Sequence, residues 1–234
     1  QIPVKASERG EDDPIIIAGG PCAYNPEPMA DFIDVFLIGD GEEVLPDFLE
    51  IYGECKKAGL SKTEFYQRVC SMEGIYIPAF YTFEYNEDKT IKKICKQYDK
   101  APLPVKRAIL PEIESVDFPV NPIIPMIEAV HDRSVVETFR GCTRGCRFCQ
   151  AGMIYRPVRE RSKEKILDLA LTQLKNTGND ELSLLSLSTS DYSQFENDNK
   201  SAENGSAIQA VKGDVVLPRV GTRCLGKVGI ILNG

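Results

Sequence analysis

The sequence predicts an α/β fold, and two observations carry that prediction. In the first sixty residues, short apolar runs alternate with segments of helical character, as in parallel doubly wound sheets. From residue 134 onward, a strand, a cysteine-rich loop, a helix and a second strand follow one another. With 234 residues, 42% of them hydrophobic, the chain is long enough for one or two domains with a buried core.

Residues 1–60 are predicted to form part of a parallel doubly wound domain. Residues 15–18 are a continuous apolar run that ends at Gly-Gly-Pro, which is typical of a strand buried on both faces. Asn25 followed by Pro26 predicts the N-cap and first turn of a short helix that ends near Phe32. Residues 35–38 form a second buried strand, and a helix over residues 44–57 is expected to end before Gly59.

Residues 61–133 are predicted to form a connector that contains a hairpin. A helix is expected over residues 62–70. Residues 80–85 and 90–94 have the composition of paired strands, and the polar residues between them suit a turn. Six prolines between positions 102 and 125 interrupt the next stretch, which predicts an extended segment at a domain boundary.

Regular structure is expected again from residue 134. Residues 135–139 form a strand that leads into the cysteine loop. Ser162 can cap a helix over residues 163–176, and Gly178 can end it. The next strand, residues 181–187, ends in a hydroxyl-rich tip at residues 188–193. Residues 197–234 form an atypical tail that begins with a polar stretch, and we expect this stretch to be poorly ordered.

Three of the eight cysteines lie close together, as Cys142, Cys146 and Cys149, in a CxxxCxxC spacing. Three thiolates can hold three irons of a cubane iron–sulfur cluster and leave the fourth iron open to an exogenous ligand. A structural zinc ion usually has four protein ligands, often from two CxxC pairs, and the sequence has no second pair. The alternative is a non-catalytic, zinc-stabilised module that contacts RNA or an acidic partner, with His131 or Cys224 as the fourth ligand.

Residues 141–150, with Phe148 directly before Cys149, resemble the cluster loop of the radical S-adenosylmethionine (SAM) enzymes. Residues 15–21, 25–28 and 36–43 resemble the later half of a cobalamin-binding domain. Residues 137–161 and 187–193 are similar to an uncharacterised family of radical SAM proteins that contain a B12-binding domain. The resemblance covers residues 10–196 and implies a partial cobalamin-binding-like domain over 1–60, the connector over 61–133, and the start of a radical SAM (β/α) barrel over 134–196.

This resemblance implies a chemistry and a set of binding residues. Cys142, Cys146 and Cys149 would ligate a [4Fe–4S] cluster, whose open iron chelates SAM. One electron, from a donor such as flavodoxin or ferredoxin, would then cleave SAM to methionine and a 5′-deoxyadenosyl radical. Phe148 would present its backbone to the adenine. The residues expected near the SAM amino group are Ser188, Thr189 and Ser190.

Three points of this assignment stay open. Residues 188–190 are hydroxyl-rich where the family has a different short motif, so a strand-to-loop turn with local hydrogen bonds is the alternative. Cobalamin is a further candidate cofactor, although the opening strands of its domain are not recognised in this sequence. No catalytic side chain is assigned.

The net charge and its distribution limit the kinds of partner that the chain is expected to bind. The net charge of −7 gives the whole chain no attraction for nucleic acid or an anionic membrane. Residues 140–165, however, contain eight basic and two acidic residues. This excess suits an anionic cluster or an RNA substrate, and a solvated basic surface is the alternative. The substrate to be modified could therefore be RNA or a small molecule, and the sequence leaves both alternatives open.

The sequence also predicts the cellular compartment of the protein and an incomplete barrel. No apolar run is long enough to span a bilayer and no signal peptide is recognised, so we expect a cytoplasmic, reducing environment. The barrel pattern stops after its second strand, and residues 197–234 do not resemble the family. We therefore expect a fragment, with a frame shift or foreign sequence near residue 197, that does not turn over; the alternative is a divergent natural C-terminus. Formation of 5′-deoxyadenosine would contradict this expectation.

Overall fold

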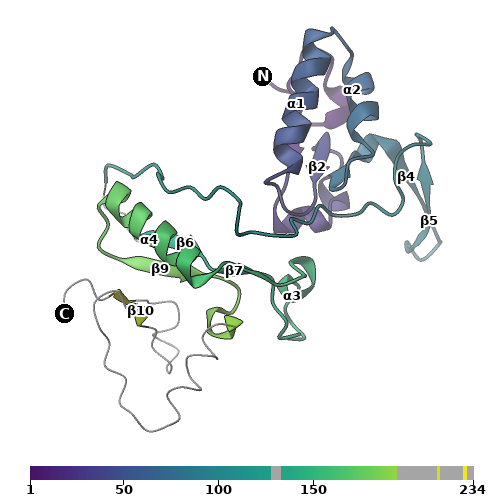
Figure 1. Ribbon diagram of the computed structural model, residues 1–234. Coiled ribbons are helices and arrows are strands. Elements are labelled where there is room, and N and C mark those ends of the chain that lie inside the picture. Colours follow the sequence, from purple (N-terminus) through teal and green to yellow (C-terminus); the bar gives the residue numbers. More distant parts are fainter. Residues whose placement is uncertain (128–132, 194–214, 217–228, 231–234) are drawn as a thin grey trace. The chain divides into compact units, whose positions relative to one another are not determined.

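A computed structural model describes residues 1–127, 133–193, 215–216 and 229–230, and shows a mixed α/β chain (Figure 1). The chain divides into two compact units, Gln1–Leu110 and Pro111–Gly234. None of the helices in the described ranges is long and apolar enough to cross a membrane. The predicted tail lies outside the described residues except for strands β10 (Val215–Val216) and β11 (Gly229–Ile230), which pair antiparallel.

The first unit is built on a three-stranded sheet in the order β1-β2-β3. Strands β1 (Ile17–Ala18) and β2 (Val35–Leu37) are parallel, as predicted, whereas β3 (Ile75–Tyr76) pairs antiparallel with β2. Two helices lie between β2 and β3 in the sequence, and the second helix returns the chain so that β3 runs against β2. The sheet is therefore mixed, and part of the predicted connector belongs to it.

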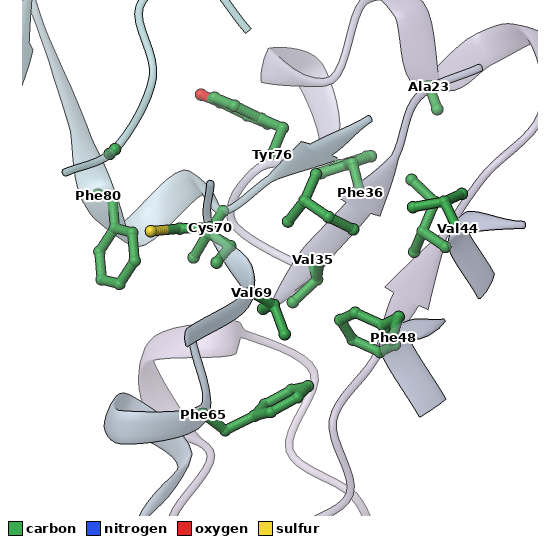
Figure 2. Close-up of a cluster of buried hydrophobic side chains, with 14 of the residues drawn as sticks. Ala23, Val35, Phe36, Val44, Phe48, Phe65, Val69, Cys70, Tyr76 and Phe80 are labelled. Atoms are coloured by element: carbon green, nitrogen blue, oxygen red, sulfur yellow. The ribbon is translucent and has the colours of Figure 1, made fainter. Parts of the chain in front are cut away.

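The two helices of this unit have the predicted positions. Helix α1 spans Val44–Lys57, and Gly59 follows it with φ +68°. Helix α2 spans Lys62–Val69 and begins at a capping box, in which the Ser61 side chain and the Glu64 side chain each bond the other residue's backbone N–H. Both helices place aromatic and aliphatic side chains against the sheet. Figure 2 shows this core, where Phe48 and Phe65 meet edge to face with ring centroids 5.1 Å apart beside Val35.

Two predictions for the N-terminal segment are wrong. The short helix expected from Asn25 is replaced by a 3₁₀ turn, Glu27–Met29, which follows another such turn at Pro21–Tyr24, because closely spaced prolines without N–H groups cannot support a continuous α-helix here. The first strand is not buried on both faces: Ile17 is exposed. Among the described residues β1 is an edge strand that pairs only with β2, so it lacks a covering neighbour.

The rest of the first unit consists of two short elements and the predicted hairpin. A 3₁₀ turn covers Ala6–Glu8, and another, Pro78–Phe80, leads into strand β4 (Tyr81–Tyr85). Strand β4 pairs antiparallel with β5 (Ile91–Lys96), which confirms the hairpin. The proline-containing segment then returns to the sheet, where Gly39 and Ala108 form a parallel bridge.

The second unit contains a strand–helix–strand motif that agrees with the prediction. Strands β6 (Ser134–Glu137) and β9 (Leu182–Leu185) are parallel neighbours, and helix α4 (Lys163–Thr177) connects them and packs on β6. The Ser162 side chain accepts a hydrogen bond from the Lys165 N–H, and Gly178 ends the helix in the left-handed conformation. The described residues of the second unit hold no closed barrel, since a (β/α) barrel needs a closed ring of parallel strands and this unit has only the β6–β9 parallel pair among them.

A small antiparallel hairpin interrupts this motif. Strand β7 (Phe139–Arg140) pairs with β8 (Arg159–Glu160), and the segment between them holds the cysteines and the short helix α3 (Ala151–Ile154). The strand predicted over 135–139 is thus divided between β6 and β7. A 3₁₀ turn, Thr189–Asp191, follows β9.

Tyr192 connects β7 to the start of α4, and its ionisation is expected to lower the stability of the fold at alkaline pH. Its hydroxyl donates to the Arg161 carbonyl at 2.6 Å, and its ring stacks on Phe139. Burial, followed by the charges of nearby glutamates, raises the pKa of Tyr192 to about 12. Since the unfolded value is about 10, the stabilisation from neutral Tyr192 is complete below pH 10 and is lost as the pH rises toward 12.

Denaturant unfolding at several pH values tests this. The wild type should lose more stability between pH 10 and 12 than Tyr192→Phe, which has no hydroxyl to ionise. Equal losses in the two proteins would contradict the assignment.

Candidate iron–sulfur site

The three clustered cysteines lie in one loop, closed at its base by β7 and β8. Gly141 is the first residue after β7 and has φ +99°, a conformation that favours glycine. A Cβ atom there would lie 2.8 Å from the Pro157 carbonyl oxygen and 2.9 Å from the Tyr155 carbonyl oxygen. Arg159 strengthens this base by donating to the same two carbonyl groups. The loop therefore begins from a tightly packed base.

Within the loop, all three thiols are free and none is fully buried. Cys146 is exposed, and Cys142 and Cys149 are half-buried. The Cys149 N–H donates to the Cys146 carbonyl at 3.0 Å, so these two cysteines share a turn. The part of the chain that is described contains no group of three or more His, Cys, Asp or Glu side chains placed to hold a metal ion. The sulfur atoms thus share one short loop without forming a closed ligand cage.

The chemistry of this donor set fits an iron–sulfur cluster. Thiolates are the ligands that iron–sulfur clusters use, and three accessible thiols on one loop can be loaded from solution. Of the alternative zinc ligands, His131 and Cys224 both lie outside the described residues. The other four described cysteines, Cys22, Cys55, Cys70 and Cys95, are also free and belong to the first unit.

Arg144, between the first two cysteines, links the loop to the end of β9. Its Nε donates to Asp191 Oδ2 at 2.6 Å, and its Nη2 donates to Asp191 Oδ1. The hydrogen bond from Arg144 holds the pKa of the Asp191 carboxyl below its usual range, although partial burial opposes the shift, and the nearby Ser188 and Ser190 side chains add to the lowering. The hydrogen bond to Asp191, aided by the charges of Asp191, Cys142 and Cys146, raises the pKa of Arg144.

The structure brings together some of the residues predicted for SAM and leaves others apart. Ser188, Thr189 and Ser190 lie in the segment that reaches the cysteine loop through Asp191. Thr189 also shares a 2.8 Å hydrogen bond with Ser186, in agreement with the local bonding considered for this turn. Phe148 is 93% exposed, so its side chain packs little against the described residues. The roles of these residues toward SAM stay predictions.

The basic segment is less available to a partner than its sequence indicates. Arg161 is buried, donates to the Ile113 carbonyl and lies over the Phe118 ring at 5.5 Å. Arg140 forms two 3.0 Å hydrogen bonds with Glu137. With Arg144 and Arg159 also engaged inside the unit, at least half of the eight basic residues have structural partners. The composition of the segment could not reveal this.

A concave region lies in the first unit, after β2. It is a cavity of about 310 Å³ with both carboxylate and apolar walls. One of its acidic residues, Asp40, is 9% exposed and accepts a 2.9 Å hydrogen bond from the Leu110 N–H. This bond attaches the proline-containing segment to the sheet, so the buried carboxylate has a structural role.

Comparison with known proteins indicates the superfamily that the cysteine loop resembles, from a match in a different part of the chain. The family described as "Radical SAM proteins, N-terminal" matches residues 1–78. An uncharacterised protein of Methanocaldococcus jannaschii, MJ0966, is 29% identical over 190 residues, which cover 81% of this chain and 35% of that protein. The chain therefore matches about a third of the length of this relative. No solved structure matches the chain significantly. The match of its first 78 residues supports membership of the radical SAM superfamily.

Proposed function

We propose that this chain carries the cluster-binding part of a radical SAM enzyme. Cys142, Cys146 and Cys149 hold a [4Fe–4S] cluster through three of its irons, and SAM binds at the fourth. When bound, the cluster supplies the electron that cleaves SAM to methionine and a 5′-deoxyadenosyl radical. The observation that carries this proposal is the presence of three free, accessible thiols in one loop at the carboxyl end of the parallel β6–β9 pair.

The residues around the cysteines have roles of their own in this proposal. Gly141 lets the chain leave β7 at a sharp angle, so that Cys142 follows directly from a packed base. The segment after β9 reaches the same region, which supports the assignment of Ser188, Thr189 and Ser190 to the amino group of SAM. Phe148, beside Cys149, offers its backbone to the adenine. The electron enters from a donor such as flavodoxin or ferredoxin.

Metal analysis after anaerobic reconstitution tests the proposal. The full chain is incubated with ferrous iron, sulfide and a thiol reductant, desalted, and assayed for iron, sulfide and zinc. We expect iron and acid-labile sulfide in equal amounts, with a brown colour from broad visible absorption. A colourless protein that binds one zinc ion and takes up no iron would support the zinc-stabilised module instead.

A further inference from the structure

One side chain of the cysteine loop reaches beyond the loop. Arg144 forms a two-point ion pair with Asp191, with its Nε 2.6 Å from Oδ2 and its Nη2 bonded to Oδ1. Arg144 lies two residues after Cys142 and two before Cys146, and Asp191 lies six residues after the end of β9. In the described part of the unit, no other side chain of residues 142–149 hydrogen-bonds outside the loop.

The carboxylate that receives Arg144 is itself held in place. The Asp191 N–H donates to the Ser188 carbonyl at 2.8 Å, which closes the 3₁₀ turn after β9. The next residue, Tyr192, is buried against Phe139 at the base of the loop. Asp191 is thus fixed to the framework of the unit, and Arg144 docks the loop onto it. A bidentate guanidinium–carboxylate pair fixes direction as well as distance.

We propose that the Arg144–Asp191 ion pair is the positioning element of the cluster loop. It holds the segment between Cys142 and Cys146 over the carboxyl end of β9. In this arrangement the three sulfurs and the residues assigned to SAM occupy one region. The effect of the pair on metal retention rests on the proposed function, whereas the pair docks the loop in the metal-free protein as well.

The pair stabilises the loop more than it stabilises the fold. Arg144 is 60% exposed, and exposed ion pairs contribute little to the free energy of unfolding. A positioning role therefore predicts normal folding with altered metal retention. Residues that orient metal ligands typically change metal affinity by about 10- to 100-fold when they are replaced.

The experiment uses the full chain in four variants. Arg144→Gln and Asp191→Asn each break the pair, the double variant Arg144→Gln/Asp191→Asn breaks it without changing net charge, and Arg144→Asp/Asp191→Arg restores it in reverse. Arg147→Gln is the matched control, because Arg147 is exposed in the same loop and has no ion pair with any described residue. The readouts are iron release to EDTA from the reconstituted protein and amide hydrogen exchange of residues 142–149 in the metal-free protein.

We expect the two single variants and the neutral double variant to release iron about tenfold faster than the wild type. Their loop amides should also exchange faster, while the circular dichroism spectrum is unchanged. The reversed pair should recover most of both differences, and Arg147→Gln should behave as the wild type.

Two results would overturn the proposal. One is wild-type amide exchange of the loop in the double variant. The other is iron release and loop exchange in Arg147→Gln as fast as in Arg144→Gln, which would attribute the change to the charge of the loop alone. Failure of the wild type to bind iron would contradict the proposed function. The exchange measurement would still decide whether the pair docks the loop.

Discussion

Each of the single variants Cys142→Ser, Cys146→Ser and Cys149→Ser should lose most of the iron that the reconstituted wild-type protein binds. A cluster held by three protein thiolates retains only two after the substitution, and a serine hydroxyl is a poor ligand because it stays protonated near neutral pH. The fold should persist, since none of the three side chains is fully buried. Iron and sulfide per chain, measured after anaerobic reconstitution and desalting, give the result directly.

Cys22→Ser is the matched control for this series. Cys22 is another exposed, free cysteine, and it belongs to the first unit, outside the loop. This variant should bind as much iron and sulfide as the wild type. An equal loss in Cys22→Ser, or full iron content in all three loop variants, would show that the metal binds elsewhere or nonspecifically.

Gly141→Ala should open the base of the cysteine loop. The residue has φ +99°, which costs a non-glycine residue about 1–3 kcal/mol. In addition, the new Cβ would lie 2.8–2.9 Å from the backbone atoms of Tyr155, Pro157 and Val158, which cannot all move aside. We expect faster amide exchange in β7 and β8 and a lower iron content, both measured on the full chain.

Gly152→Ala separates this effect from the general cost of adding a methyl group near the cysteines. Gly152 lies in α3 with ordinary backbone angles, and its nearest contact would be the Cys142 carbonyl oxygen at 3.8 Å. Alanine there should be neutral or slightly stabilising, because alanine is the better helix former. Wild-type exchange and iron content in Gly141→Ala would contradict the packed base.

The sequence was most informative where one local signal determines an element. Ser162 is the N-cap of α4, and Gly178 has the left-handed conformation that ends this helix. The polar residues 86–89 turn the chain between β4 and β5. In each case the controlling residue lies within a few positions of the element that it begins or ends, so the pattern could be read without knowledge of the tertiary structure.

Features that depend on distant contacts could not be predicted. The antiparallel direction of β3 follows from the way two helices return the chain, and the exposure of Ile17 follows from the edge position of β1. The β7–β8 hairpin consists of two residue pairs, too few to produce a periodic pattern.

The candidate site was partly predictable for the same reason. The three cysteines form a local spacing, so the loop was recognisable. Arg144 and Asp191 are 47 positions apart, and only the parallel pairing of β6 with β9 brings them together. The alternation of strand and helix predicted that pairing, but not which charged residues would meet at its end.

The central claim is that three cysteines hold a cluster with one iron open to SAM. Low-temperature electron paramagnetic resonance of the dithionite-reduced, reconstituted chain, recorded with and without SAM, tests it most directly. We expect a [4Fe–4S]⁺ signal whose shape changes when SAM is added, because SAM coordinates the iron that has no protein ligand. A cluster signal that saturating SAM leaves unchanged, or a protein that forms no cluster at all, would contradict the account.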